Sequence, residues 1–326
     1  MGASESTDLP FYDTANTDAT IVLEKPIQWY TPGETVSGKV SINIPWSKPI
    51  SLDLMGEVGY TMTYSTDTNM VRVAYHRMPF FTVTKTDVND GDKFELKLAE
   101  ELPPSVNTEK NSYPYIRYLI QVNFSRTHKS RYWIIVCPRV VLNRANIRPV
   151  HFDAFNRKQM RLVCSIDQEW VLPGDQLQIE YKITNQNQEL IKSMDGNISM
   201  KAIVRGIDYN ETILNFVIDD VYDTKDDYVS GMTRISLPTQ YFPPSFSYFN
   251  EKTRFRVHIE YLLSVDVHVE GVNTSLKTTV PLMIGFEPEN ITFNEVMSPN
   301  QHRLSVTSLH KKRHSRLRHF SRFSHS

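Results

Sequence analysis

The sequence predicts an all-β protein made of two tandem antiparallel β-sandwiches, followed by a basic C-terminal tail that we expect to be disordered. Two observations predict the sandwiches: turn motifs occur twice at one interval, and apolar residues alternate with polar ones through much of the chain. The uneven distribution of charge predicts the tail. With 326 residues, the chain is long enough for about two domains of ~150 residues each.

Two turn motifs occur once in each half of the chain. Trp29-x-x-Pro32-Gly33-Glu34 returns as Trp170-x-x-Pro173-Gly174-Asp175, and Leu102-Pro103-Pro104-Ser105 returns as Phe242-Pro243-Pro244-Ser245. Both intervals are about 140 residues, which indicates a duplicated domain. Pro-Gly favours a type II turn that leads into a strand, whereas Pro-Pro ends a strand because it cannot donate ladder hydrogen bonds. These repeated residues are therefore predicted to have structural roles.

Period-two alternation predicts half-buried strands in both halves. It is clearest at residues 36–44 and 116–124 of the first half and at residues 177–183 and 255–267 of the second. No stretch has helical periodicity over a dozen residues. Short strands at a spacing of about ten residues, separated by turn residues, are typical of β-sandwiches.

The repeats and the composition together predict the domain limits. We expect the first sandwich at 20–142, a polar connector at 143–158, the second sandwich at 159–286 and the disordered tail at 287–326. The last segment is rich in Ser, His and Arg and poor in apolar residues, so it cannot bury enough surface to fold.

The tail concentrates positive charge. After Glu295 the chain has no acidic residue and seven Lys or Arg residues; since the whole chain carries a formal net charge of −1, the remainder carries −8. A flexible basic segment is attracted to anionic lipid by up to ~1 kcal/mol per cation. The predicted membrane-contact residues are Lys311, Lys312, Arg313, Arg316, Arg318 and Arg322. Contact with nucleic acid, which we consider unlikely, and a tail that is solvated or docked on the acidic body are the alternatives.

Both termini carry patterns for modification. Ser315, Ser321 and Ser324 each follow an Arg by no more than three residues, and phosphorylation there would subtract charge and release the tail from an anionic surface. Met1-Gly2-x-x-x-Ser6 fits the myristoylation pattern, so Gly2 is a candidate for lipidation, with a plain flexible terminus as the alternative. An acyl chain and a basic tail would together form a two-signal anchor.

No catalytic constellation is present in the sequence. There is no Gly-x-Ser-x-Gly motif, no phosphate-binding glycine loop and no recognisable Cys/His pairing, so we predict no catalytic residues, no enzymatic activity and no cofactor. Cys137 and Cys164 lie in apolar runs and are predicted to be buried. Asp266, His268 and Glu270 share one face of a strand and could chelate a metal. We interpret them instead as the solvated side of that strand and predict no metal site.

The low cysteine content and the lack of a pattern for a signal peptide or a membrane span favour a cytoplasmic location. Two cysteines are few for a secreted pair of sandwiches, which would more often carry disulfides. We find no apolar core for a signal peptide and no apolar run long enough to cross a bilayer.

The ordered set of motifs resembles the arrestin domain-containing (alpha-arrestin) family over residues 20–285. In the first half, the resemblance rests on residues 29–40, 91–98, 102–105 and 115–122. In the second half, it rests on residues 173–175, 183–187, 242–245, 256–265 and 280–285. The resemblance implies two cupped arrestin-like sandwiches without an active site. It implies a cytosolic adaptor that connects membrane cargo proteins or receptor tails to the endocytic, sorting or ubiquitination machinery, at the plasma membrane or endosomes.

One feature of that family is missing. Many alpha-arrestins carry Pro-Pro-x-Tyr motifs after the second domain, which WW domains bind. The nearest tetrapeptide here, Pro243-Pro244-Ser245-Phe246, lacks the tyrosine and lies within a domain. The resemblance therefore does not extend to recruitment of a ubiquitin ligase by that route. A retromer-type coat subunit in vesicle transport, an extracellular adhesion-like double sandwich and a metalloenzyme that uses the Asp266 strand stay open as alternatives.

Overall fold

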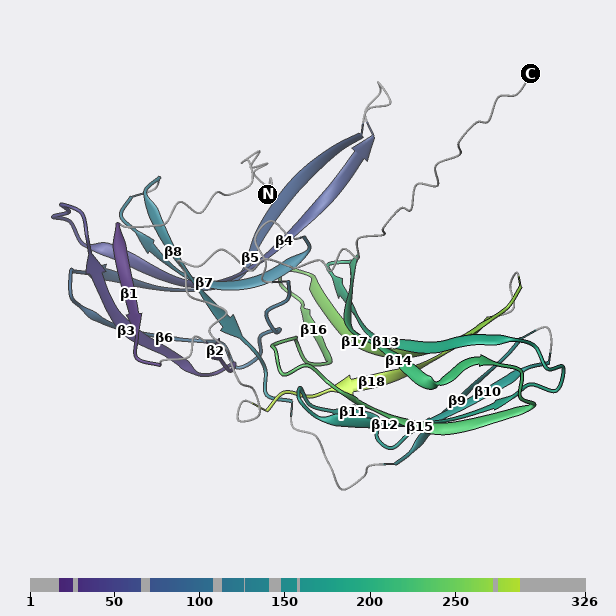
Figure 1. Ribbon diagram of the computed structural model, residues 1–326. Helices are drawn as coiled ribbons and strands as arrows, with labels where there is room; N and C mark the ends of the chain where they lie inside the picture. Colours follow the sequence, from purple (N-terminus) through teal and green to yellow (C-terminus); the bar gives the residue numbers. More distant parts are fainter. Residues whose placement is uncertain are drawn as a thin grey trace, which may run out of the picture. The chain divides into compact units, whose positions relative to one another are not determined.

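The computed structural model describes residues 18–25, 29–65, 71–107, 113–125, 127–140, 148–156, 159–271 and 275–287 (Figure 1). In this part of the chain, every regular element is a β-strand, from β1 to β18. The strands form two sandwiches in succession, which confirms the predicted fold class. The predicted domain limits stay a prediction.

The first sandwich pairs a three-stranded sheet with a five-stranded sheet. The smaller sheet has the order β1 (Ala19–Leu23), β3 (Thr35–Ile42), β6 (Lys93–Lys97). The larger sheet has the order β2 (Trp29–Tyr30), β8 (Lys129–Val136), β7 (Tyr115–Asn123), β4 (Ile50–Ser65), β5 (Val71–Val88). Alternate residues of both sheets, such as Val36 and Leu54, are fully buried in one core, because a strand of period two presents one face to the opposite sheet.

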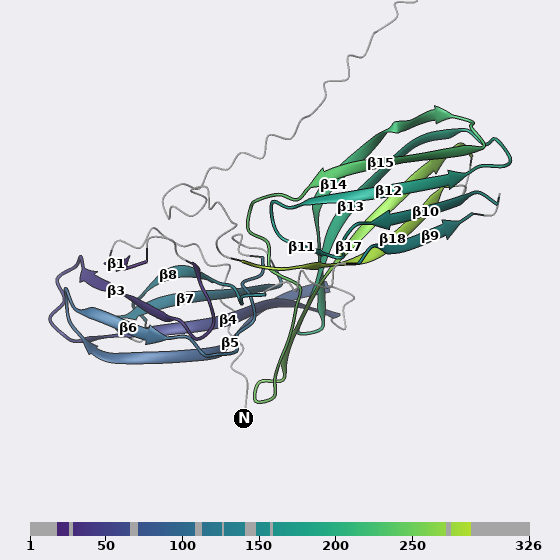
Figure 2. The same cartoon turned by 90° about the horizontal axis from the view of Figure 1, so that it is seen from below.

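The second sandwich repeats this strand order. One sheet runs β15 (Tyr228–Ser236), β12 (Gln176–Thr184), β10 (Arg161–Ile166), β9 (Val150–Phe155), and Figure 2 shows these strands side by side. The other runs β11 (Trp170–Val171), β18 (Leu276–Ile284), β17 (Phe255–Val269), β13 (Ile191–Val204), β14 (Ile207–Thr224), and β16 (Phe246–Asn250) also pairs with β17. The duplication expected from the motifs is therefore present in the topology.

The repeated Trp-x-x-Pro-Gly motifs form the same turn in both sandwiches. Gly33 and Gly174 have φ values of 82° and 86°, which only glycine adopts without strain. Each turn is followed by a carboxylate that accepts the hydrogen bond of a backbone amide three residues before it. In the first sandwich this is Glu34 with the Thr31 amide, at 2.8 Å, and in the second it is Asp175 with the Leu172 amide, at 2.9 Å.

The short strands beside these turns make parallel pairs in otherwise antiparallel sheets. Trp29 on β2 is in register with Ile135 on β8, and Trp170 on β11 is in register with Met283 on β18. A strand from the early part of each sandwich therefore lies directly against its last strand.

The serine of each Pro-Pro-Ser motif joins the loop to the last strand. The Ser105 amide donates to the Val136 carbonyl at 2.7 Å, and the Ser105 hydroxyl accepts from the Val136 amide at 3.0 Å. Ser245 makes the same two bonds to Ile284, both at 2.9 Å. The hydroxyl thus replaces a missing strand as the acceptor for a buried amide.

We expect Ser105→Ala and Ser245→Ala each to lower the free energy of unfolding by about 1–3 kcal/mol, because each leaves a buried backbone amide without its acceptor. Urea unfolding measures the cost. Ser→Thr at the same positions keeps the hydroxyl and is the control. The two costs should add in the double variant, since the sites lie in different sandwiches. A cost within experimental error in both single variants would contradict this role.

A strand occupies part of the expected connector. Residues 150–155 form β9, which pairs antiparallel with β10, where the sequence predicts a polar connector at 143–158. Phe152 and Ala154 pack on the second core, while His151 and Asp153 alternate with them. The alternation spans only six residues, which is too short to stand out within a polar segment.

Described contacts join the two sandwiches, both of which lie in one compact unit, residues 1–294. The rings of Phe80 on β5 and Phe255 on β17 have centroids 4.9 Å apart. The Tyr241 hydroxyl donates to the Ser105 carbonyl at 2.8 Å, and Val140 makes an antiparallel bridge with Phe286. We refer to these contacts as the seam.

Candidate functional site

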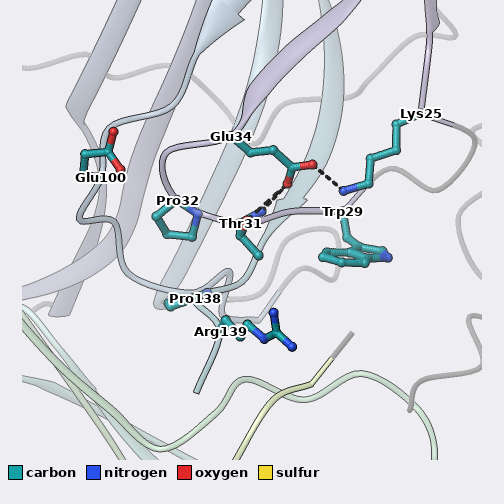
Figure 3. Close-up of a pocket in the computed structure, with 8 residues that line it drawn as sticks. All are labelled: Lys25, Trp29, Thr31, Pro32, Glu34, Glu100, Pro138 and Arg139. Atoms are coloured by element: carbon teal, nitrogen blue, oxygen red, sulfur yellow. Dashed lines mark hydrogen bonds and ion pairs between the residues drawn. The ribbon is translucent and has the colours of Figure 1, made fainter. Parts of the chain in front are cut away.

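A cavity of about 450 Å³ lies beside the turn of the first Trp-x-x-Pro-Gly motif (Figure 3). Its lining combines two cations, two carboxylates, a tryptophan and two prolines: Lys25, Trp29, Thr31, Pro32, Glu34, Glu100, Pro138 and Arg139. Lys25 follows β1, the turn leads into β3, and Pro138 and Arg139 follow β8. Residues 25–34, Glu100, and residues 138–139, which are distant from one another in sequence, therefore converge on this cavity.

Glu34 is the centre of the polar contacts in the cavity. Its Oε2 accepts from the Thr31 amide at 2.8 Å, and its Oε1 accepts from Lys25 Nζ at 2.8 Å; Figure 3 marks both. Lys25 Nζ also lies 4.0 Å from the centroid of the Trp29 ring, which is the geometry of a cation–π contact. The ammonium is thus held between a carboxylate and an aromatic face.

Partial burial raises the pKa of Glu34, but the hydrogen bonds from Lys25 and the Thr31 amide outweigh this effect, so the pKa lies below its ordinary value. Glu34 is therefore charged at neutral pH. A carboxylate whose pKa is lowered by folding stabilises the fold above its unfolded pKa of ~4.3, and this contribution is lost as the pH falls through the folded pKa.

We expect Lys25→Met to raise the pKa of Glu34, because it removes the closest cation and a hydrogen bond to the charged carboxylate. Carboxyl ¹³C NMR titration measures the pKa directly. Lys182→Met, on a strand of the second sandwich, is the matched control and should leave the Glu34 titration unchanged. An unchanged pKa in Lys25→Met would show that the Thr31 amide alone accounts for the shift.

Comparison of the two sandwiches distinguishes contacts that both copies make from contacts that only the first copy makes. Asp175 repeats the backbone contact of Glu34, which indicates that the carboxylate stabilises the turn in both copies. Lys25 follows β1 by two residues, and Gln168 follows β10 by two residues, but Gln168 donates to the Gln176 carbonyl at 3.4 Å instead. The ion pair and the cation–π contact thus belong to the first sandwich, beside the cavity.

Most of the other sites predicted from the sequence lie outside the part of the chain that the structure describes. Gly2, the six tail cations and Ser315, Ser321 and Ser324 lie outside the described residues. The repeated motif residues all lie within them, and of these Trp29 and Pro32 line the cavity. Lys25, Glu100 and Arg139 were not predicted as site residues, because a chemically meaningful pattern forms only when three separate segments converge.

The three residues weighed as a metal site make separate cross-strand polar contacts. Asp266 lies 3.3 Å from Lys277, His268 lies 2.8 Å from Asp195, and Glu270 pairs with Lys192 at 3.5 Å. Within the described residues there is no group of three side chains placed to hold a metal. The side chains of His268 and Glu270 are exposed, and the absence of a metal site stays a prediction.

Both cysteines are buried and free. Burial raises the pKa of Cys164 to about 12 and that of Cys137 well above its ordinary value. A thiol with so high a pKa is a poor nucleophile at neutral pH. Cys137 instead packs with Phe286, Trp29 and Tyr241 beside the seam.

The family comparison identifies the second sandwich. Residues 156–289 match the family described as arrestin (or S-antigen), C-terminal domain. The second sandwich is therefore similar to the arrestin C-terminal domain, as the predicted resemblance to arrestin domain-containing proteins implies. A comparison with curated proteins gave no significant match. No helix in the described ranges is long and apolar enough to cross a bilayer.

Proposed function

We propose that this chain is a non-enzymatic cytoplasmic adaptor that links membrane cargo proteins or receptor tails to the endocytic, sorting or ubiquitination machinery. The match of residues 156–289 to the arrestin C-terminal domain carries the proposal. The repeated strand order supports it, because two linked sandwiches offer separate surfaces for two classes of partner. Such a mechanism is positional: the adaptor raises the local concentration of the machinery near the cargo.

The edges of the sheets are the surfaces best suited to extended peptides. β5 and β14 each end the strand order of a large sheet, so one side of each has backbone amides and carbonyls without a neighbouring strand in the described topology. An extended cargo tail can add to such an edge through main-chain hydrogen bonds, while side-chain pockets select the sequence.

Proximity labelling in the native cell tests the adaptor role. The full chain fused to a labelling enzyme should enrich membrane proteins together with sorting or ubiquitination components, relative to the labelling enzyme alone. Recovery of a single assembly of fixed stoichiometry would favour the retromer-type coat subunit instead. Enrichment of neither membrane proteins nor sorting components would contradict both.

We also propose that the tail cations Lys311 to Arg322 hold the adaptor at anionic membranes, and that Ser315, Ser321 and Ser324 regulate this contact. Replacing the three serines by Asp should weaken binding to phosphatidylserine vesicles by about tenfold or more, because each charge near the surface contributes up to ~1 kcal/mol. Vesicle co-sedimentation measures the effect, and replacement of the same serines by Ala is the control. Equal binding of both variants would contradict the switch.

A further inference from the structure

β5 and β14 end the strand order of equivalent sheets in the two sandwiches, but they carry opposite charge. β14 contains five acids and no Lys, Arg or His, whereas β5 contains three Lys or Arg residues and one acid. The acids of β14 are Asp208, Glu211, Asp219, Asp220 and Asp223. Because charge complementarity selects partners, the two edges favour segments of opposite charge.

The carboxylates of β14 are available to a partner. All five acids are exposed, and within the described residues none of them takes part in an ion pair. Glu211 accepts a hydrogen bond from the Tyr209 hydroxyl at 2.9 Å. Asp219, Asp220 and Asp223 accept no hydrogen bond from a described residue. The three aspartates at the end of the strand thus keep their full capacity to accept.

A bulge interrupts β14 where two of these aspartates lie. Between Val217 and Tyr222, the four residues 218–221 face a single residue of β13. The extra residues of a bulge leave the ladder, and their side chains are re-aimed. The first and the last of the four are buried, whereas Asp219 and Asp220 between them are exposed. The bulge therefore presents two adjacent carboxylates at the edge of the sheet.

Apolar side chains accompany these carboxylates. Val217 and Tyr222, on either side of the bulge, are 63% and 70% exposed, and Tyr228 at the start of β15 is 57% exposed. Large exposed apolar residues that cluster beside an unpaired strand edge favour contact with another chain. The edge therefore offers apolar contacts as well as charge.

A buried hydroxyl near the bulge lacks a partner. Tyr181 of β12 is 1% exposed, and its hydroxyl makes no hydrogen bond to a described residue. The hydroxyl oxygen lies beside Gly231 of β15, where a Cβ would be only 2.2 Å away. Burial and the charge of Asp220 raise the pKa of Tyr181, so the hydroxyl lies close to the acidic bulge. Since buried hydroxyls are normally paired, this one indicates that a polar group is missing here.

The chemistry of this edge selects an extended segment that is basic and partly apolar. A strand that adds to β14 places its side chains about 5 Å from those of β14, so its Lys and Arg residues come within reach of the carboxylates. A second copy of β14 is disfavoured, because acids would face acids. Cytoplasmic segments next to a membrane span carry an excess of Lys and Arg. A membrane cargo of the adaptor therefore has such a segment to offer.

We propose that the bulged edge of β14 binds the basic juxtamembrane segment of a membrane protein by strand addition. The segment pairs its backbone with β14, its Lys or Arg side chains with Asp219, Asp220 and Asp223, and its apolar residues with Val217 and Tyr222. This inference rests on the proposed adaptor role and names the cargo chemistry that one edge selects. The basic edge of β5 repels the same segment.

Binding of synthetic peptides to the full chain tests the need for charge and for backbone pairing. A fluorescent peptide that alternates Lys with Val and Leu should bind, and added salt should weaken the binding because exposed ion pairs are screened. The same peptide with Glu in place of Lys should not bind. A peptide with equal Lys content but with Pro at alternate apolar positions cannot pair with a strand edge, so it should bind about tenfold more weakly. Equal binding of the Pro peptide would overturn strand addition.

Charge-neutral variants locate the site. Replacement of Asp219, Asp220 and Asp223 by Asn keeps the shape of the side chains and should weaken binding of the Lys peptide by about tenfold or more. The matched control replaces three exposed acids outside β14 by Gln, namely Glu95, Glu101 and Glu251. It makes the same change in net charge and should leave the binding unchanged. Equal affinity of the two variants would show that the peptide responds only to net charge, which contradicts the proposal.

Hydrogen exchange distinguishes the occupants of the edge. The Lys peptide should slow exchange in β14 and leave β5 unchanged. Slow exchange in β14 without peptide that is lost on removal of residues 296–326 would assign the edge to the tail. Self-association of the chain that is abolished by the three Asp→Asn changes would assign it to a second copy. Either result would overturn the proposal. These assays use the isolated chain, so their outcome is separate from that of the proximity labelling that tests the adaptor role.

Discussion

Phe255→Ala is expected to lower the free energy of unfolding by about 3–5 kcal/mol and to divide thermal unfolding into two transitions. The Phe255 side chain is 0% exposed, and its ring contacts Phe80 of the first sandwich as well as Tyr248 of the second. Its removal leaves a cavity where the two sandwiches share one hydrophobic core. The coupling between them is then lost together with the packing.

Differential scanning calorimetry distinguishes loss of coupling from simple destabilisation. Phe94→Ala is the matched control, because Phe94 is also a buried phenylalanine but lies on β6, within the first sandwich. We expect this control to lower the transition temperature while a single transition remains. A single, shifted transition in Phe255→Ala as well would contradict a coupling role for the contact.

Gly196→Ala is expected to lower the free energy of unfolding by about 3 kcal/mol. A Cβ at this position would lie 2.4 Å from the Phe216 ring and 2.5 Å from the Ser264 carbonyl oxygen. The ring could rotate, but Ser264 is part of the β13–β17 ladder, so the backbone cannot move without loss of strand hydrogen bonds.

Chemical denaturation measures this cost against Gly206→Ala. Gly206 has no atom within 4 Å of the added Cβ but has a φ of 82°, so the control reports backbone strain alone, at about 1–2 kcal/mol. A cost for Gly196→Ala no larger than that of the control would show that the strand accommodates the methyl group.

Gly196 also shows what the sequence contained beyond the turn motifs. Gly56 precedes it by the interval of the Pro-Pro motifs, and in both copies an aromatic ring from the next strand covers the glycine: Phe80 over Gly56 and Phe216 over Gly196. The repeat therefore includes a glycine that leaves room for an aromatic ring of the next strand. This feature is recognised only when the two copies are compared. In the first copy, the ring that fills this space is also the one that contacts Phe255.

The duplicated turns and long strands could be predicted because their signals are local. Pro-Gly fixes a backbone conformation by itself, and a long strand such as β17 shows its alternation without reference to its neighbours. β9 was not predicted because its alternation spans only six residues.

The candidate site was beyond local reasoning. Lys25, Glu34 and Arg139 line one cavity only because the ends of β1, β3 and β8 lie close together in the fold. The burial of Leu119 on β7 was equally hidden, since alternation with the core residues Tyr118 and Ile120 assigns Leu119 to the exposed side. Both features depend on tertiary structure, to which local sequence patterns are insensitive.

The parallel pairs Trp29–Ile135 and Trp170–Met283 have a consequence for the history of the chain. Because early and late strands of each sandwich are neighbours, the points at which a copy is entered and left are close together. Tandem duplication of a gene segment that encodes such a unit adds a second copy without changing the path of the chain in the first. The strand arrangement is thus compatible with tandem duplication of the sandwich.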